Sequence, residues 1–77
     1  MLTLYVKAGC PFCRRVLDAA AELGVSLEEK DVADPEVAAE LVARGGKLQT
    51  PYLVDGARGI EMYESDDIIA YLRETCI

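Results

Sequence analysis

The sequence predicts one α/β domain over residues 1–77, in the order β-α-β-α-β-β-α, with a mixed four-stranded sheet and helices on both faces. Three observations predict this class. A strand–helix–strand unit opens the chain, and such a crossover makes its two strands parallel. A turn rich in Asp and Gly then joins two further strands, which are therefore antiparallel. A last segment with helical periodicity and an acidic start closes the chain.

The first half of the chain has clear strand and helix boundaries. Residues 2–6 alternate and are rich in β-formers, which predicts a buried strand. Residues 11–23 carry apolar side chains at helical spacing and stop at Gly24, which predicts a helix and its end. Residues 25–32 predict a second strand, and the charged stretch 28–30 places it at an exposed edge.

The second half begins with Asp34-Pro35-Glu36, where a side-chain acceptor, a proline and an acid together predict a helix start. We expect Gly45-Gly46 to end this helix. Its predicted buried stripe consists of Val37, Ala38, Leu41 and Val42. The remaining elements are a strand at 52–54, a turn at 55–59, a returning strand at 60–63, and a helix from Ser65-Asp66-Asp67 with Ile68, Ile69, Tyr71 and Leu72 facing inward.

Composition limits the partners. The net charge of −6, from 14 acidic and 8 basic residues, repels phosphates, so we expect no nucleic acid partner. Every apolar stretch is far shorter than the roughly 20 residues of a membrane span, so no membrane partner is expected either. The strand directly after Met1 leaves no room for a secretory signal. We therefore expect a cytoplasmic monomer in a reducing compartment.

The pair Cys10 and Cys13 lies where the first strand gives way to the first helix. A helix N-terminus stabilises a thiolate, and Lys7, Arg14 and Arg15 add positive charge nearby. Cys10 should therefore have a lowered pKa and be the attacking sulfur, with Cys13 as the resolving thiol. Cys-x-x-Cys beside a β-α-β pattern indicates redox chemistry. With three cysteines and no histidine, we expect no metal site, because structural zinc needs about four ligands.

Residues 5–15, 45–51 and 65–67 carry motifs that make the chain resemble glutaredoxin, within the thioredoxin-like fold. Two departures stand out. Phe12 replaces a tyrosine that is common in that family, and the usual Gly-Gly pair is missing. The segments 59–65 and 68–72 are instead similar to the glutathione-binding N-terminal domain of glutathione transferases, with Glu64-Ser65 as the pair that holds the γ-glutamyl end.

The resemblance implies glutathione as the co-substrate and reductant, with no bound cofactor. It implies a cis peptide at Thr50-Pro51, facing the cysteine pair, and an aromatic wall from Phe12. The N-terminus of the last helix, at Ser65, would bind one carboxylate of glutathione while Asp66 binds its ammonium group. Lys7 and Lys47 match family positions that hold the other carboxylate.

The function this implies is that of a dithiol glutaredoxin, which reduces protein disulfides and protein–glutathione mixed disulfides through Cys10. Two alternatives stay open. The chain could be a thioredoxin-like electron donor reduced by a flavoprotein reductase, or an iron–sulfur carrier with glutathione as a cluster ligand. Pro11 disfavours the carrier, whose relatives generally lack that proline. The chain ends at Ile77 with no helical second domain, so we do not expect a complete transferase. Tyr63 receives no role at this stage, and Cys76 is expected to be an incidental thiol.

Overall fold

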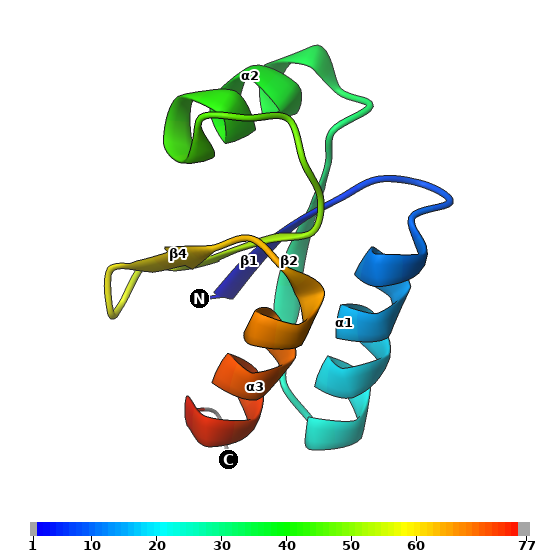
Figure 1. Ribbon diagram of the computed structural model, residues 1–77, viewed down its shortest axis with the longest axis vertical. Helices are drawn as coiled ribbons and strands as arrows, with labels where there is room; N and C mark the ends of the chain where they lie inside the picture. The colour runs from blue at the N-terminus through cyan, green and yellow to red at the C-terminus, as the bar shows by residue number, and fades with distance from the viewer. Residues whose placement is uncertain (1, 76–77) are drawn as a thin grey trace.

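The computed structural model describes residues 2–75, and Cys76 lies outside them. Figure 1 shows the three helices arranged around the sheet. The elements are β1 (Leu2–Val6), α1 (Pro11–Leu23), β2 (Leu27–Asp31), α2 (Pro35–Gly45), β3 (Tyr52–Asp55), β4 (Ile60–Met62) and α3 (Ser65–Thr75). Their order confirms the predicted β-α-β-α-β-β-α sequence and the α/β class.

The four strands form one mixed sheet in the order β2-β1-β3-β4. β1 is parallel to β2 and antiparallel to β3, which pairs in turn with the antiparallel β4. β2 is an edge strand, as its charged residues predict, and both Glu28 and Glu29 are exposed. The loop before α1 follows the end of β1, and the loop before β3 leads into the start of β3. Tyr5 near the end of β1 pairs with Tyr52 at the start of β3, so the two loops lie at the same end of the sheet.

Helices cover both faces of the sheet, with α2 alone on one face and α1 beside α3 on the other (Figure 1). Alternation along β1 directs Leu4 toward α1 and α3 and Tyr5 toward α2. Two separate apolar clusters result. The cluster under α1 and α3 contains Leu4, Val16, Ala20, Leu53, Ile68 and Leu72. The cluster under α2 contains Tyr5, Leu41, Tyr52 and Val54.

Some details differ from the prediction, and β2 begins at Leu27 rather than at residue 25. Val42 is 42% exposed, and Leu41 is the buried residue of α2, because this helix lies alone on its face and turns much of its surface to water. β4 ends at Met62, so Tyr63 is not part of the sheet ladder. The predicted helix ends at Gly24 and Gly46 are confirmed, and both residues have left-handed backbone conformations.

Membrane-spanning helices are absent from residues 2–75. None of the helices there combines the necessary length with sufficient apolar character.

Candidate active site

Cys10 is the N-cap residue of α1, with an extended backbone at φ −84° and ψ 108°. Its Sγ accepts a hydrogen bond from the backbone nitrogen of Cys13 at 3.2 Å. Pro11 occupies the first turn of the helix, where a backbone N–H would have no intrahelical partner. The sulfur thus takes the place that a Ser or Asp side chain holds in an ordinary N-cap, and it faces the free N–H groups of the helix.

The two thiols differ in environment, and both are free of a disulfide. Partial burial disfavours the Cys10 thiolate, but hydrogen bonds from the Cys13 side chain and backbone, the Thr50 hydroxyl and the Phe12 backbone outweigh it and lower the pKa of Cys10. Burial raises the pKa of Cys13, and the hydrogen bond with Cys10 raises it further. Cys13 is 2% exposed. At neutral pH the more accessible sulfur is therefore also the better nucleophile.

The two arginines expected to lower the pKa of Cys10 are paired with carboxylates instead. Arg14 pairs with Asp18 one turn further along α1, with 3.2 Å between Nε and Oδ1. Arg15 pairs with Asp66 on α3. The direction of the predicted shift holds for Cys10, but its source is hydrogen bonding to the sulfur rather than the neighbouring guanidinium groups.

Thr50 brings the loop before β3 against Cys10. Its hydroxyl donates toward Cys10 Sγ over 3.7 Å, and its carbonyl oxygen lies 4.0 Å from the same sulfur. The Thr50–Pro51 peptide is cis, as the resemblance implied. Pro51 is buried at the start of β3. The attacking sulfur therefore lies beside a fixed backbone segment with its own donor and acceptor groups.

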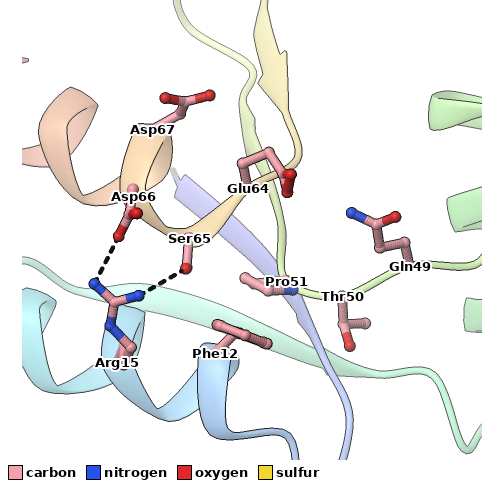
Figure 2. Close-up of a pocket in the computed structure, with 9 residues that line it drawn as sticks. All are labelled: Phe12, Arg15, Gln49, Thr50, Pro51, Glu64, Ser65, Asp66 and Asp67. Carbon is pink, nitrogen blue, oxygen red and sulfur yellow. Dashed lines mark hydrogen bonds and ion pairs between the residues drawn. The ribbon is translucent and has the colours of Figure 1, made fainter.

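A cleft of about 610 Å³ extends from this segment to the start of α3. Figure 2 shows its walls: Phe12 and Arg15 from α1 on one side, the loop before β3 on another, and the start of α3 on the third. The lining residues are Phe12, Arg15, Gln49, Thr50, Pro51, Glu64, Ser65, Asp66 and Asp67. Phe12 is 56% exposed, so an aromatic ring faces the cleft beside charged and polar side chains.

Arg15 connects two of these walls. Its Nη2 lies 2.6 Å from Oδ1 of Asp66, and its Nη1 lies 3.3 Å from Oγ of Ser65, as Figure 2 shows. Ser65 is buried, whereas the side chain of Asp66 is 78% exposed. The cleft therefore contains both a guanidinium group and carboxylates, together with the N-terminal N–H groups of α3.

Glu64 has a positive φ of 71°, which is uncommon for a residue other than glycine. Its carbonyl oxygen accepts the first hydrogen bond of α3, from the backbone nitrogen of Ile68 at 3.0 Å. This conformation turns the chain sharply between β4 and α3 and places the Glu64 side chain at the cleft. Unusual backbone conformations of this kind are concentrated at binding sites.

The structure thus brings most of the predicted site residues together, namely Cys10, Phe12, Cys13, Thr50, Pro51, Ser65 and Asp66. The two predicted lysines lie outside the cleft. Lys7 lines a second hollow together with Cys10, Cys13, Glu29 and Asp31. The ammonium of Lys47 lies 5.0 Å from the ring centroid of Tyr63.

Sequence reasoning gave no ligand-binding role to Gln49 or Asp67, and it expected Arg15 only to add positive charge near Cys10, although all three residues line the cleft. Arg15 and Asp66 are 51 positions apart, and their pairing depends on the packing of α1 against α3. The available signal for Gln49 was its place directly before Thr50-Pro51. Asp67 follows two predicted site residues and was considered only as part of the helix start.

Comparison with known proteins gives a family and a fold. The family model described as "Glutathione S-transferase, N-terminal domain" matches residues 4–76. A glutaredoxin from Brucella melitensis is 31% identical, with a TM-score of 0.71, over 96% of this chain and 79% of that one. A delta-class glutathione transferase from Nilaparvata lugens is 29% identical, with a TM-score of 0.82, over 97% of this chain and 36% of that one.

The trimeric glutathione transferase TDR1 from Leishmania is 35% identical, with a TM-score of 0.80, over 96% of this chain and 16% of that one. The chain therefore spans about a third of the delta-class transferase and a smaller share of TDR1, but most of the glutaredoxin. No curated protein matches the sequence. These matches confirm both resemblances, to glutaredoxin and to the N-terminal domain of glutathione transferases.

Proposed function

We propose a redox function for this chain, which belongs to the family of glutathione S-transferase N-terminal domains. Its family and fold indicate glutathione-linked redox or transferase chemistry. Within that range, the proposed activity is that of a dithiol glutaredoxin, a glutathione-dependent thiol–disulfide oxidoreductase. The observation that carries the proposal is Cys10 at the N-cap of α1, hydrogen-bonded by Cys13 and Thr50, beside a polar cleft.

With a glutathionylated protein, the Cys10 thiolate attacks the glutathione sulfur of the mixed disulfide. The bond between that sulfur and the protein breaks, and the protein leaves as a thiolate that takes up a proton. A second glutathione thiolate then attacks the Cys10-bound glutathione, which yields glutathione disulfide and restores the Cys10 thiolate. Overall, one free glutathione thiol is oxidised into glutathione disulfide and one protein thiol is regenerated, so the step exchanges one thiol and one disulfide for another thiol and disulfide.

With a protein disulfide, Cys10 forms a mixed disulfide with one substrate sulfur and releases the other. Cys13 then attacks the Cys10 sulfur, which frees the reduced protein and leaves a Cys10–Cys13 disulfide. Two glutathione molecules reduce that disulfide and leave as glutathione disulfide. The raised pKa of Cys13 suits this order, because Cys13 keeps its proton more readily than Cys10 does while Cys10 attacks. Once the Cys10 sulfur is part of the mixed disulfide, the hydrogen bond that helped to raise the pKa of Cys13 is lost.

The cleft supplies groups that complement glutathione. A carboxylate would bind at Ser65 and the N-terminal N–H groups of α3, where the positive end of the helix dipole favours an anion. The ammonium would bind to Asp66, and Phe12 with Thr50-Pro51 would flank the cysteinyl part next to Cys10. Arg15 adds a cation beside the carboxylate position. In this arrangement Lys7, which lines the same hollow as Cys10, and Lys47 would act on the second carboxylate from outside the cleft.

The proposed partners are glutathione and proteins that carry disulfides or glutathione adducts, and the proposed acting form is a monomer in a reducing compartment such as the cytoplasm. The test is a glutathione-coupled turnover assay on the wild type, Cys10→Ser and Cys13→Ser, with a glutathionylated peptide and a protein disulfide as substrates. Cys10→Ser should lose both activities, since a hydroxyl at neutral pH is a far weaker nucleophile than a thiolate.

Cys13→Ser should keep deglutathionylation, which uses Cys10 alone, and lose most of its reduction of protein disulfides. In a parallel assay, a flavoprotein thioredoxin reductase replaces glutathione as the electron source. Efficient turnover there, with little glutathione-dependent activity in the wild type, would contradict the proposal and indicate a reductase-coupled donor.

A further inference from the structure

Tyr63 lies between β4 and the start of α3, directly before Glu64 and Ser65. Its hydroxyl makes two hydrogen bonds to one residue of the opposite loop. It donates to the carbonyl oxygen of Lys47 at 2.6 Å and accepts from the backbone nitrogen of Lys47 at 3.3 Å. The Tyr63 hydroxyl thus satisfies both the N–H and the carbonyl group of the Lys47 backbone, as a neighbouring strand would.

The ring of Tyr63 is held on three sides. Gly45 at the end of α2 leaves room for it, since a Cβ atom at that position would overlap the phenol oxygen and ring carbons. The Tyr52 ring packs at a tilt, with 4.4 Å between centroids. The ammonium of Lys47 covers another side of the ring at 5.0 Å from its centroid. These contacts hold the hydroxyl at the Lys47 backbone.

The two segments joined in this way continue into opposite walls of the cleft. Lys47 is followed by Gln49, Thr50 and Pro51, while Tyr63 is followed by Glu64 and Ser65 (Figure 2). The 47–51 segment also carries the Thr50 hydroxyl that donates toward Cys10 Sγ. The position of this loop therefore affects both the width of the cleft and the hydrogen bonding of the attacking sulfur.

We propose that Tyr63 is a positioning residue that fixes the 47–51 loop against the start of α3 and thereby sets both glutathione affinity and the reactivity of Cys10. This inference rests on the proposed function for its ligand, glutathione. Tyr63 is not among the residues that line the cleft, so its effect passes through the backbone of Lys47 and the loop that follows.

The main test is Tyr63→Phe, which removes the two hydroxyl hydrogen bonds and keeps the ring. Loss of such contacts should raise the KM for glutathione about two- to tenfold with a smaller change in kcat. The alkylation rate of Cys10 as a function of pH should shift to higher pH, because Thr50 is held less firmly near the sulfur. The matched control is Tyr71→Phe, which removes a hydroxyl bonded to Asp55 away from the cleft.

A purely structural role would lower the melting temperature of both variants and leave KM and the alkylation profile of Tyr63→Phe at wild-type values. That result would overturn the proposal. Failure of the proposed function looks different, because wild-type protein would then show no glutathione turnover. In that case the alkylation profile, which needs no turnover, still tests the link from Tyr63 to Cys10, and an unshifted profile overturns it.

A second variant approaches the same contact from α2. Gly45→Ala adds one methyl group, which favours a helix locally but overlaps the Tyr63 ring. The proposal expects Gly45→Ala to raise KM and shift the alkylation profile as Tyr63→Phe does. In a Tyr63→Ala background, where the ring is gone, Gly45→Ala should add little. If Gly45→Ala has equal effects with and without the ring, the proposal is wrong, even where Tyr63→Phe fails to fold.

Discussion

Nη2 of Arg15 lies 2.6 Å from Oδ1 of Asp66, and this ion pair joins α1 to α3 at the edge of the cleft. Both side chains are at least half exposed, so water screens the pair and its contribution to folding is small. Its effect on the cleft is larger. Arg15 is the basic residue among the cleft lining of residues 2–75, whereas Glu64, Asp66 and Asp67 are acidic.

Arg15→Gln should weaken the use of glutathione, which carries two carboxylates and one ammonium group. We expect KM to rise about two- to fivefold, the size expected for an exposed charge contact, and the difference to shrink as salt is added. Arg44→Gln, which breaks a partly exposed pair with Glu61 outside the cleft, is the control and should leave KM unchanged. A lower KM in Arg15→Gln would mean that Arg15 competes with the ammonium of glutathione for Asp66.

The two thiols should alkylate in a fixed order. Hydrogen bonds to Cys10 lower its pKa, so at any given pH it holds more thiolate than an ordinary cysteine, while burial and the hydrogen bond with Cys10 raise the pKa of Cys13. Limited iodoacetamide treatment near pH 6, followed by peptide mass mapping, should therefore find Cys10 modified well before Cys13. A Cys76→Ser background removes the third thiol from the measurement. Modification of Cys13 first would reverse the assigned roles.

Asp55 should make stability depend on pH in the acidic range. The Tyr71 hydroxyl at 2.5 Å, and then Arg58 at 3.0 Å, donate to this buried carboxylate and lower its pKa. A carboxyl group with a lowered folded-state pKa stabilises the fold above its unfolded pKa of about 3.9, and this contribution is lost as pH falls through the folded value.

Thermal unfolding from pH 7 to pH 2 should therefore show a steeper loss of stability below about pH 4 in the wild type than in Asp55→Asn. The variant should also be less stable at pH 7, because the amide is a poorer partner for Arg58. Glu28→Gln, at an exposed position on β2, is the control and should follow the wild type. Parallel curves for wild type and Asp55→Asn would show that Asp55 contributes nothing to this dependence.

Local sequence signals predicted most of the fold and the centre of the site. Proline and aspartate at the start of α2, and glycine after α1, fix helix ends through interactions within a few residues. Cys10 belongs to the same class, since its role follows from being at a helix N-terminus. The exposed Val42 shows the limit, because helical spacing alone does not say how wide a face the sheet will cover.

Contacts between distant segments could not be predicted in this way. The Arg15–Asp66 pair depends on how α1 and α3 pack, and no local pattern distinguishes Arg15 from the solvated Arg14 beside it. Tyr63 lies where a strand was expected to continue. Its contact with Lys47 appears only once β4 ends at Met62 and the loop after α2 passes beside it.

The attachment of α2 has a consequence for how the molecule opens. This helix has a single fully buried apolar residue, Leu41, with Val37 partly buried beside it, and its side-chain hydrogen bonds to other elements join Glu40 to Tyr5 and Lys30, and Arg44 to Glu61. Such a segment separates from the sheet at a lower free energy than the whole chain unfolds. Its amide hydrogens should exchange with solvent sooner than those of α1. Since the loop after α2 forms a wall of the cleft, a bound ligand should slow that exchange. Hydrogen exchange in α2 would then report ligand binding, although no residue of α2 lines the cleft.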